Sequence, residues 1–386
     1  MLDFTSVLYL GFRHAYRTLR PWAQLTTGRP ATLEEAPEAV TLAQDLARLV
    51  GCERAVLAPS TLHLYWDLFD VLARDHVAIY ADAGTYPIAR WGIERAAAKG
   101  VPTSTFPIHD PAALESLLIR GERARRRPIV VADGLCTATG RIAPLPDYLK
   151  LIRERNGYLV IDDTQALGIL GKMPACDAPY GRGGAGTPAW NGVEGPEVII
   201  GSSLAKGFGA PLAVLAGNAK LITKFEELGA TRVHSSPPSL ADISAAQRAL
   251  AANETRGDSL RSHLAKLVRH FRESLGEIGL SPSGGLFPVQ TLKAIPGVDP
   301  APLYRRLLSL GVRAVLRSTR HAPGVALTFL VTVFHTRSDI SRCMGALQQS
   351  ILLIRHERAK QDSALNGAGS RALDLSTNAS AAGGWR

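Results

Sequence analysis

The residue with the clearest capacity for covalent chemistry is a lysine in a turn rich in serine and glycine. Lys206 follows Gly201-Ser202-Ser203-Leu204-Ala205 and precedes Gly207-Phe208-Gly209. Small neighbours let the backbone turn closely around a bound molecule, and a lysine with a depressed pKa can form a Schiff base with a carbonyl group. The hydroxyls of Ser202 and Ser203 can donate hydrogen bonds to a phosphate. Taken alone, the segment equally suits a solvated lysine in a turn.

A second reactive group lies upstream of this lysine. The apolar run Tyr158–Ile161 ends in Asp162 and Asp163, followed by Thr164-Gln165. A carboxylate at the end of a strand can keep a pyridine nitrogen protonated, which makes the ring an electron sink. The alternative is that the two carboxylates cap the next helix. A strand-end aspartate followed by a strand-end lysine is more informative than either residue alone.

Seven short apolar runs lie before, at and after these residues, and amphipathic segments separate most of them. Runs of this length without polar alternation are typical of strands buried on both faces, which predicts a mostly parallel α/β sheet. Ligands of such sheets bind at the carboxyl ends of the strands, where Asp162 and Lys206 stand. The runs are 54–58, 76–81, 101–106, 128–132, 158–161, 198–202 and 212–216.

The pattern changes in the second half of the chain. A long amphipathic segment, 243–275, is followed by a second set of strand and helix patterns and by a helix over 338–355. We therefore expect a large domain over 41–240 and a smaller α/β C-terminal domain over 241–358, with residues 1–40 packing on the small domain. From Ala359 to Arg386, Ser, Ala, Gly and Asn dominate, which predicts a disordered tail.

Composition narrows the possible partners and the location. The formal net charge of +10 favours anionic partners such as phosphorylated cofactors, coenzyme A or acidic carrier proteins. Nucleic acid is not expected, because the basic run Arg123–Arg127 has no interleaved aromatic residue for base stacking and suits a solvated helix end. The four cysteines are too far apart for a metal or redox pair, and no export segment or membrane span is evident, so we expect a cytoplasmic protein without a metal.

Three motifs in order resemble one known family. The run Asp133-Gly134-Leu135-Cys136-Thr137-Ala138-Thr139-Gly140-Arg141-Ile142-Ala143-Pro144-Leu145-Pro146, followed by the Asp162 and Lys206 segments, is similar to the α-oxoamine synthases. The resemblance implies the type I PLP-dependent transferase fold, with a mostly parallel seven-stranded large domain, and pyridoxal 5′-phosphate (PLP) as cofactor. Members of the family act as homodimers and condense an amino acid with an acyl thioester.

The resemblance assigns roles residue by residue. It makes Lys206 the Schiff-base lysine and Asp162 the partner of the pyridine nitrogen. It also implies a set of contacts to the cofactor ring or phosphate, the last two of them across the dimer interface: Thr137 near the ring, and Ser60, Thr61, Ser203, Ser235 and Ser236 at the phosphate.

Three positions depart from the family pattern. Tyr86 stands where the family stacks a histidine on the ring, and Gln165 replaces a histidine that contacts the cofactor's phenolic oxygen. Glutamine can donate a hydrogen bond but does not titrate. Thr328 occupies the place of the arginine that binds the substrate carboxylate, so either Arg317 or Arg320 substitutes for that arginine or the substrate lacks an ordinary α-carboxylate.

These departures leave three functional hypotheses. The first is a divergent transferase that condenses an amino acid or amine with acyl-CoA or an acyl carrier protein. The second keeps the same cofactor site but carries out transamination, or another reaction at the α or β carbon, on an unusual amino substrate. The third is a non-catalytic partner subunit, which the retained Lys206 disfavours.

Overall fold

The computed structural model describes residues 1–15, 17, 24–137, 139–318 and 324–378. Its large domain is built on a seven-stranded sheet in the order β2-β10-β9-β8-β5-β3-β4. Only β10 runs antiparallel to its neighbours. The strands are β2 (Arg54–Ala58), β3 (Val77–Asp82), β4 (Thr103–Phe106), β5 (Arg127–Asp133), β8 (Tyr158–Asp162), β9 (Val198–Ser203) and β10 (Ala213–Gly217). The seven predicted runs correspond to these seven strands, so the predicted mostly parallel α/β sheet is confirmed.

Helices cover both faces of this sheet and make a three-layered domain. One apolar cluster joins the sheet to helices α2, α3 and α7, and a second cluster joins the opposite face to α1, α4 and α5. This double covering explains why the strands are apolar on both faces. The helices of the large domain are α1 (Pro37–Val50), α2 (Thr61–Leu72), α3 (Pro87–Ala98), α4 (Pro111–Gly121) with the 3₁₀ turn η2 (Glu122–Ala124), α5 (Leu145–Arg153), α6 (Gly186–Asn191), α7 (Ala219–Leu228) and α8 (Ala230–His234).

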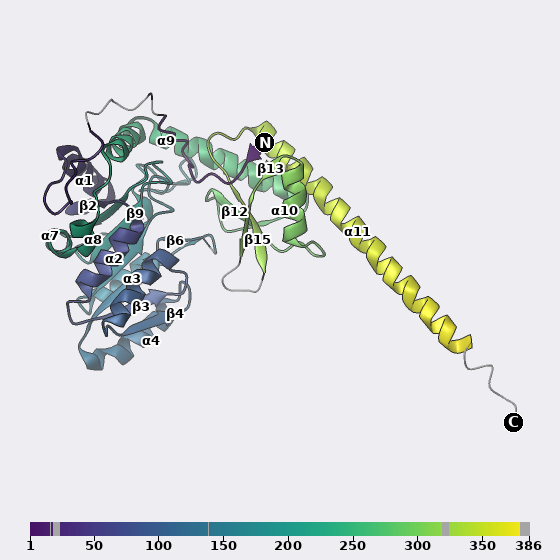
Figure 1. Cartoon of the computed structure of the whole chain (residues 1–386), viewed down its shortest axis with the longest axis horizontal. Coiled ribbons are helices and arrows are strands. Elements are labelled where there is room, and N and C mark those ends of the chain that lie inside the picture. Colours follow the sequence, from purple (N-terminus) through teal and green to yellow (C-terminus); the bar gives the residue numbers. More distant parts are fainter. Residues whose placement is uncertain (16, 18–23, 138, 319–323, 379–386) are drawn as a thin grey trace.

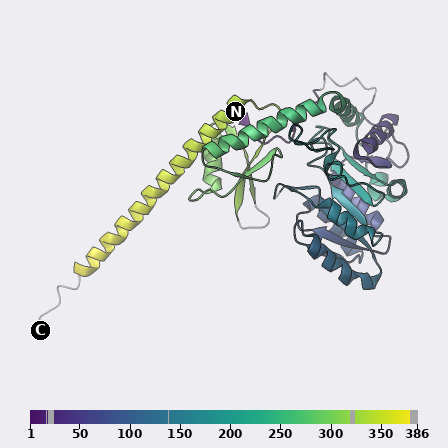
Figure 2. The same ribbon diagram turned by 180° about the vertical axis from the view of Figure 1, so that it is seen from behind.

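Helix α9 (Leu240–Glu277) connects the large domain to a smaller α/β unit (Figures 1 and 2). The small unit contains a four-stranded antiparallel sheet in the order β11-β12-β15-β14, covered by α10 and the start of α11. Short pairs complete the fold. The elements are β11 (Pro282–Ser283), β12 (Val289–Leu292), α10 (Pro300–Ser309), β14 (Val315–Ser318), β15 (Val325–Leu330) and α11 (Arg337–Asn378), with the pairs β1 (Leu2–Asp3) with β13 (Val312–Arg313) and β6 (Leu135–Cys136) with β7 (Arg141–Ile142).

The N-terminal segment runs along the small unit before it reaches the large domain. Strand β1 pairs in parallel with β13, and the Phe4 carbonyl accepts a hydrogen bond from the Leu330 amide at 2.8 Å. The Phe4 ring stacks on His335 and lies against Phe329 and Phe271. Further on, His14 Nε2 lies 2.9 Å from the Phe208 carbonyl oxygen, close to the Lys206 turn. Residues 2–14 therefore tie the small unit to the turn that carries the lysine.

The C-terminal helix is longer than the sequence suggested. The expected helix over 338–355 is the first part of α11, which continues to Asn378 and projects from the rest of the molecule in both views (Figures 1 and 2). Ala, Leu, Gln and Lys in this segment have high helix propensity, which favours regular structure beyond the expected boundary at Ala359. Among the described residues, no helix is long and apolar enough to cross a membrane.

Candidate active site

The carboxyl ends of β8 and β9 bring the aspartate and the lysine together. Asp162 is the last residue of β8 and pairs in register with Gly201 of β9, and Lys206 lies in the turn that follows β9. Burial lowers the pKa of the Lys206 amine, and the carboxylates of Asp162 and Asp133 offset part of that effect. A lowered pKa increases the neutral, nucleophilic fraction of the amine at neutral pH.

Glycines allow the loop after β8 and the loop after β9 to pack directly against each other. A Cβ on Gly207 would lie 2.3 Å from the Leu167 carbonyl oxygen, and one on Gly168 would lie 3.2 Å from the Gly207 Cα. Gly168 also has a φ of +85°, a backbone conformation that side chains disfavour. The turns after β8 and β9 thus pack backbone against backbone, which fixes Lys206 relative to Asp162.

Asp162 is held by a small set of donors beneath the site. The Thr164 amide donates to Asp162 Oδ1 at 3.1 Å, and the Tyr65 hydroxyl forms a second hydrogen bond to this carboxylate. Burial raises the pKa of Asp162, and these hydrogen bonds and Lys206 act in the opposite direction. They therefore favour the ionised carboxylate that a protonated pyridine nitrogen requires.

Tyr65 is a contact that the sequence did not reveal. It lies on α2, is completely buried, and its hydroxyl is 3.4 Å from the Gly201 carbonyl oxygen. A Cβ on Gly201 would lie 2.7 Å from that hydroxyl. Glycine at position 201 therefore makes room for the tyrosine that reaches Asp162.

A second strand-end carboxylate, Asp133, also escaped the sequence reasoning. It ends β5, pairs in register with Asp162, and accepts a hydrogen bond from the Tyr86 amide at 2.9 Å. Burial and the neighbouring Asp162 raise the pKa of Asp133 well above its ordinary value. Asp133 therefore carries the proton more readily than Asp162, because two adjacent buried carboxylates resist full ionisation.

Tyr86 and Gln165, the two replacements of family histidines, lie on either side of this pair. The Tyr86 backbone is anchored on Asp133 at the start of α3, and its side chain is 45% exposed. Gln165 Oε1 accepts a hydrogen bond from the Tyr9 hydroxyl at 3.1 Å. Tyr9 is fully buried and burial raises its pKa, so it remains a neutral donor. This contact fixes the amide of Gln165 and leaves its NH₂ group as the donor that can face a ligand.

The start of α2 provides a site for an anion. Ser60 is the N-cap residue and Thr61 the first helical residue, but the Ser60 hydroxyl lies 2.9 Å from His63 Nδ1 and does not cap the helix. The amides of the first turn consequently have no side-chain cap in the described structure. Ser203 Oγ accepts from the Ala205 amide at 3.3 Å, which leaves its proton available for donation. Amides at a helix start together with a hydroxyl donor suit a phosphate group.

One of the two arginines predicted to bind the substrate carboxylate, Arg317, lies on the small unit. Arg317 of β14 donates to the Thr137 carbonyl oxygen at 3.1 Å, so it reaches across to the loop after β6. Thr328, in contrast, is 3% exposed in the middle of the four-stranded sheet, and its hydroxyl lies 2.9 Å from that of Thr291. Of the residues named for this role, Arg317 is the cation brought to the loop of Thr137, and Arg320 lies outside the described residues.

The two serines assigned across a dimer interface are not brought to Lys206 within one chain. Ser235 follows α8, and its hydroxyl donates to the Thr231 carbonyl oxygen at 2.6 Å. Thr231 is in turn bonded to the buried Asp67 of α2 through its amide and its hydroxyl. Ser235 and the exposed Ser236 therefore belong to the surface beside α2, and their contact with a phosphate in a second copy stays a prediction.

Comparison with known proteins decides the family. The family model described as "Aminotransferase class I and II" matches residues 26–344. The chain belongs to this family. Its type I PLP-dependent transferase fold and its cofactor, pyridoxal 5′-phosphate, are thereby confirmed, and the lysine, the aspartate and the uncapped start of α2 fit that cofactor.

Individual relatives of this aminotransferase-family chain confirm the resemblance to the α-oxoamine synthases. The 8-amino-7-oxononanoate synthase of Marinobacter nauticus is 30% identical to this chain over 256 residues. The matched region covers 65% of this chain and 61% of the length of that enzyme. Among solved structures, Sphingomonas wittichii serine palmitoyltransferase has a TM-score of 0.78 at 16% identity, with 90% of this chain and 86% of that one covered. The 8-amino-7-oxononanoate synthase of Francisella tularensis has a TM-score of 0.71 at 17% identity, with 92% of this chain and 98% of that one covered.

Proposed function

We propose that this chain is a PLP-dependent transferase that condenses an amino acid or amine with an acyl thioester carried by coenzyme A or an acyl carrier protein. The observation that carries the proposal is the pairing of Asp162 with Lys206 at adjacent strand ends. The names of the curated relatives support the reaction class. The net charge of +10 suits an anionic thioester carrier.

The cofactor would supply the electron-withdrawing ring, and the side chains of the site would bind and orient it. When bound, pyridoxal 5′-phosphate withdraws electrons through its protonated ring and stabilises negative charge on the substrate carbon next to nitrogen. Asp162 would hold the proton of the ring nitrogen, and hydrogen bonds from Thr164 and Tyr65 lower a carboxyl pKa that burial raises. The amides at the start of α2 and the Ser203 hydroxyl would hold the phosphate, and the aromatic ring of Tyr86 would be the group available to stack on the cofactor ring.

Lys206 is the group in this site that moves protons. Gln165 does not titrate, and the buried Tyr9 hydroxyl that binds it stays protonated. Lys206 has a lowered pKa, so its amine accepts a proton from the substrate carbon and returns it later in the cycle. Arg317 binds the substrate carboxylate from the small unit, where its guanidinium already reaches the loop of Thr137.

We also propose that the working form is a cytoplasmic homodimer. Large apolar side chains are exposed on adjacent helices of the large domain: Leu62 at 41% and Trp66 at 36% on α2, Trp91 at 48% on α3 and Val233 at 45% on α8. A second copy would bury them and would bring Ser235 and Ser236 to the neighbouring site. Native mass spectrometry should show a dimer, and Trp91→Glu should shift it to the monomer. A wild-type monomer would contradict this part of the proposal.

The reaction is tested by loading the protein with pyridoxal 5′-phosphate and mixing it with amino acids and acyl-CoA. We expect release of free coenzyme A thiol that requires both substrates and is absent in Lys206→Ala. Borohydride should attach the cofactor to the peptide that contains residue 206. If an α-keto acid forms from the amino acid without thiol release, the protein is an aminotransferase and the condensation proposal fails.

A further inference from the structure

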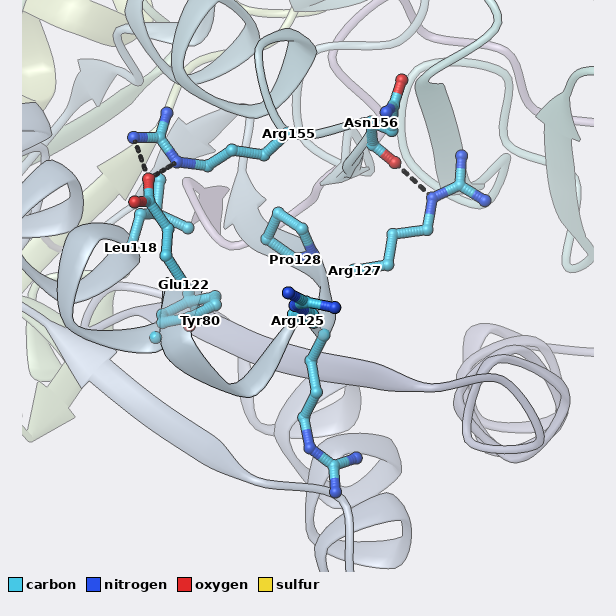
Figure 3. Close-up of a pocket in the computed structure, with 10 residues that line it drawn as sticks. Tyr80, Leu118, Glu122, Arg125, Arg127, Pro128, Arg155 and Asn156 are labelled. Carbon is cyan, nitrogen blue, oxygen red and sulfur yellow. Dashed lines mark hydrogen bonds and ion pairs between the residues drawn. The ribbon is translucent and has the colours of Figure 1, made fainter.

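A cavity of about 620 Å³ lies at the start of β5, whereas the candidate active site lies at the carboxyl ends of the strands. Figure 3 shows the residues that line this cavity. The cavity opens where β5 begins, beside the carboxyl ends of α4 and α5, and the basic run noted in the sequence forms one side of it. Strand β5 has seven residues, so its first residue, Arg127, is about 20 Å from Asp133 at its far end. The lining residues are Tyr80, Leu118, Gly121, Glu122, Arg125, Arg126, Arg127, Pro128, Arg155 and Asn156.

The charge of the lining is strongly positive. Four arginines and one glutamate line the cavity, which leaves an excess of three positive charges. Arg155 is oriented by Glu122 at 2.8 Å and by the Leu151 carbonyl oxygen at 2.9 Å. Arg127 is oriented by the Asn156 carbonyl oxygen (Figure 3). Its guanidinium also lies over the Tyr158 ring, 3.8 Å from the ring centroid.

Two further arginines have donors to spare. Arg126 makes one long hydrogen bond, at 3.4 Å, to the Val77 carbonyl oxygen. The side chain of Arg125 is bonded to no other described residue, and its backbone has a φ of +49°. A guanidinium presents five N–H donors, and this planar fork matches the geometry of phosphate. The four arginines of the lining together therefore have N–H donors that form no hydrogen bond within the described part of the protein.

A tyrosine hydroxyl at the same cavity offers a further donor. Tyr80 of β3 is 7% exposed and lines the cavity, and in the described part of the chain its hydroxyl has no hydrogen-bond partner. The hydroxyl fits only because position 121 is glycine, since a Cβ there would lie 2.2 Å from it. Its oxygen is accessible from the cavity, so a bound anion can accept a hydrogen bond from this hydroxyl.

We propose that this cavity binds a small organic molecule with two or more phosphates, through Arg125, Arg126, Arg127 and the Tyr80 hydroxyl. The volume exceeds what one phosphate needs, and the four arginines of the lining offer donors for more than one phosphate. Because the cavity lies at the start of β5, away from the carboxyl ends of the strands, its ligand is distinct from the cofactor and from the acyl thioester. It would act as a regulator or a stabiliser of the large domain.

The test uses the full-length protein with pyridoxal 5′-phosphate bound, titrated calorimetrically with pyrophosphate and with ADP at physiological salt. We expect both probes to bind the wild type and to bind about tenfold or more weakly to Tyr80→Phe and to an Arg125→Ala/Arg126→Ala double variant. Arg123→Ala is the matched control, because Arg123 is exposed on the same turn but does not line the cavity. Its affinity should equal that of the wild type.

Three results would overturn the proposal. One is the absence of saturable binding of either probe. A second is an equal loss of affinity in Arg123→Ala, which would indicate a diffuse basic surface. The third is binding of a single-stranded oligonucleotide that pyrophosphate does not displace and the double variant abolishes. Borohydride trapping at Lys206 should remain unchanged in all these variants, which shows that they fold and load cofactor.

Discussion

Tyr65 is one of the groups that lower the pKa of Asp162, together with Thr164 and Lys206, although Tyr65 and Asp162 are far apart in the sequence. Its hydroxyl donates to a carboxylate whose pKa burial raises, and this hydrogen bond lowers that pKa. Sequence patterns found Asp162 from its place at a strand end. They did not find Tyr65, because on α2 it looks like any other apolar-face residue and its partner is specified only by the packing of α2 on the sheet.

Replacing Tyr65 by phenylalanine should move the pH dependence of cofactor affinity. Without the hydroxyl the pKa of Asp162 rises, so the ionised carboxylate appears only at higher pH, and the acidic limb of affinity against pH shifts upward. Fluorescence titration of pyridoxal 5′-phosphate at several pH values measures this. The matched control is Tyr148→Phe, which removes a buried hydroxyl that donates to Asp82 at 2.9 Å. Equal shifts in both variants would contradict the role of Tyr65.

Arg317 and Thr328 were both named for the substrate-carboxylate site, but their side chains lie in different places. Arg317 reaches the loop of Thr137, whereas Thr328 bonds Thr291 inside the small sheet. We expect Arg317→Ala to raise KM for the amino acid about tenfold or more and to leave KM for the acyl thioester unchanged, because a charged hydrogen bond is lost. Thr328→Val should cost about 1 kcal/mol of stability and leave both KM values unchanged. Steady-state kinetics that show the reverse pattern would remove Arg317 from the site.

Among the elements, strands were far easier to predict than the contacts between them. The seven apolar runs fall on the seven strands within two residues at each end, because burial on both faces leaves a continuous apolar signal. Asp133 was missed as a site residue because nothing local distinguishes it from other strand-end carboxylates. Its importance comes from the pairing of β5 with β8, which places it opposite Asp162. Tyr9 was missed for the same reason, since its contact with Gln165 spans 156 positions.

Asp163 holds the start of α6 and introduces a pH dependence into stability. Its buried carboxylate accepts from the Thr187 amide and, at 2.5 Å, from the Thr187 hydroxyl. Burial raises the pKa of Asp163 from 3.8 to about 7. The folded state therefore binds a proton that the unfolded state has already released, and stability falls as pH rises from about 4 to about 7, by an amount on the order of 4 kcal/mol.

Asp163→Asn should remove this dependence. The free energy of unfolding of the wild type, relative to that of Asp163→Asn, should be smaller at pH 8 than at pH 5, because asparagine does not titrate. Thr187→Val is a companion variant that removes a hydrogen bond to the ionised form, so it should destabilise more at pH 8 than at pH 5. Urea denaturation at both pH values measures each difference. A constant difference across the range would show that Asp163 does not titrate as proposed.

The whole molecule consists of a body of two packed units and a helix that leaves it. The beginning of α11 packs on α9 and α10 through buried residues such as Leu347 and Ile351. From Leu352 onward the described side chains to Lys360 are almost all exposed, and the helix projects away in both views (Figures 1 and 2). A helix without packing partners adds little to the stability of a domain, because its own hydrogen bonds are marginal in water.

Truncation after Lys360 therefore should leave the thermal midpoint of unfolding and the cofactor affinity unchanged, and should reduce helical circular dichroism by no more than the lost residues explain. Truncation after Gly345 is the contrasting variant, because it removes the buried Leu347, Ser350 and Ile351 and should destabilise by several kcal/mol. Differential scanning calorimetry compares the two. A large fall in the midpoint after the shorter truncation would mean that the distal part of α11 packs on a second copy of the chain. Repeating the scan over a range of protein concentrations would then reveal that contact, since dimer stability depends on concentration.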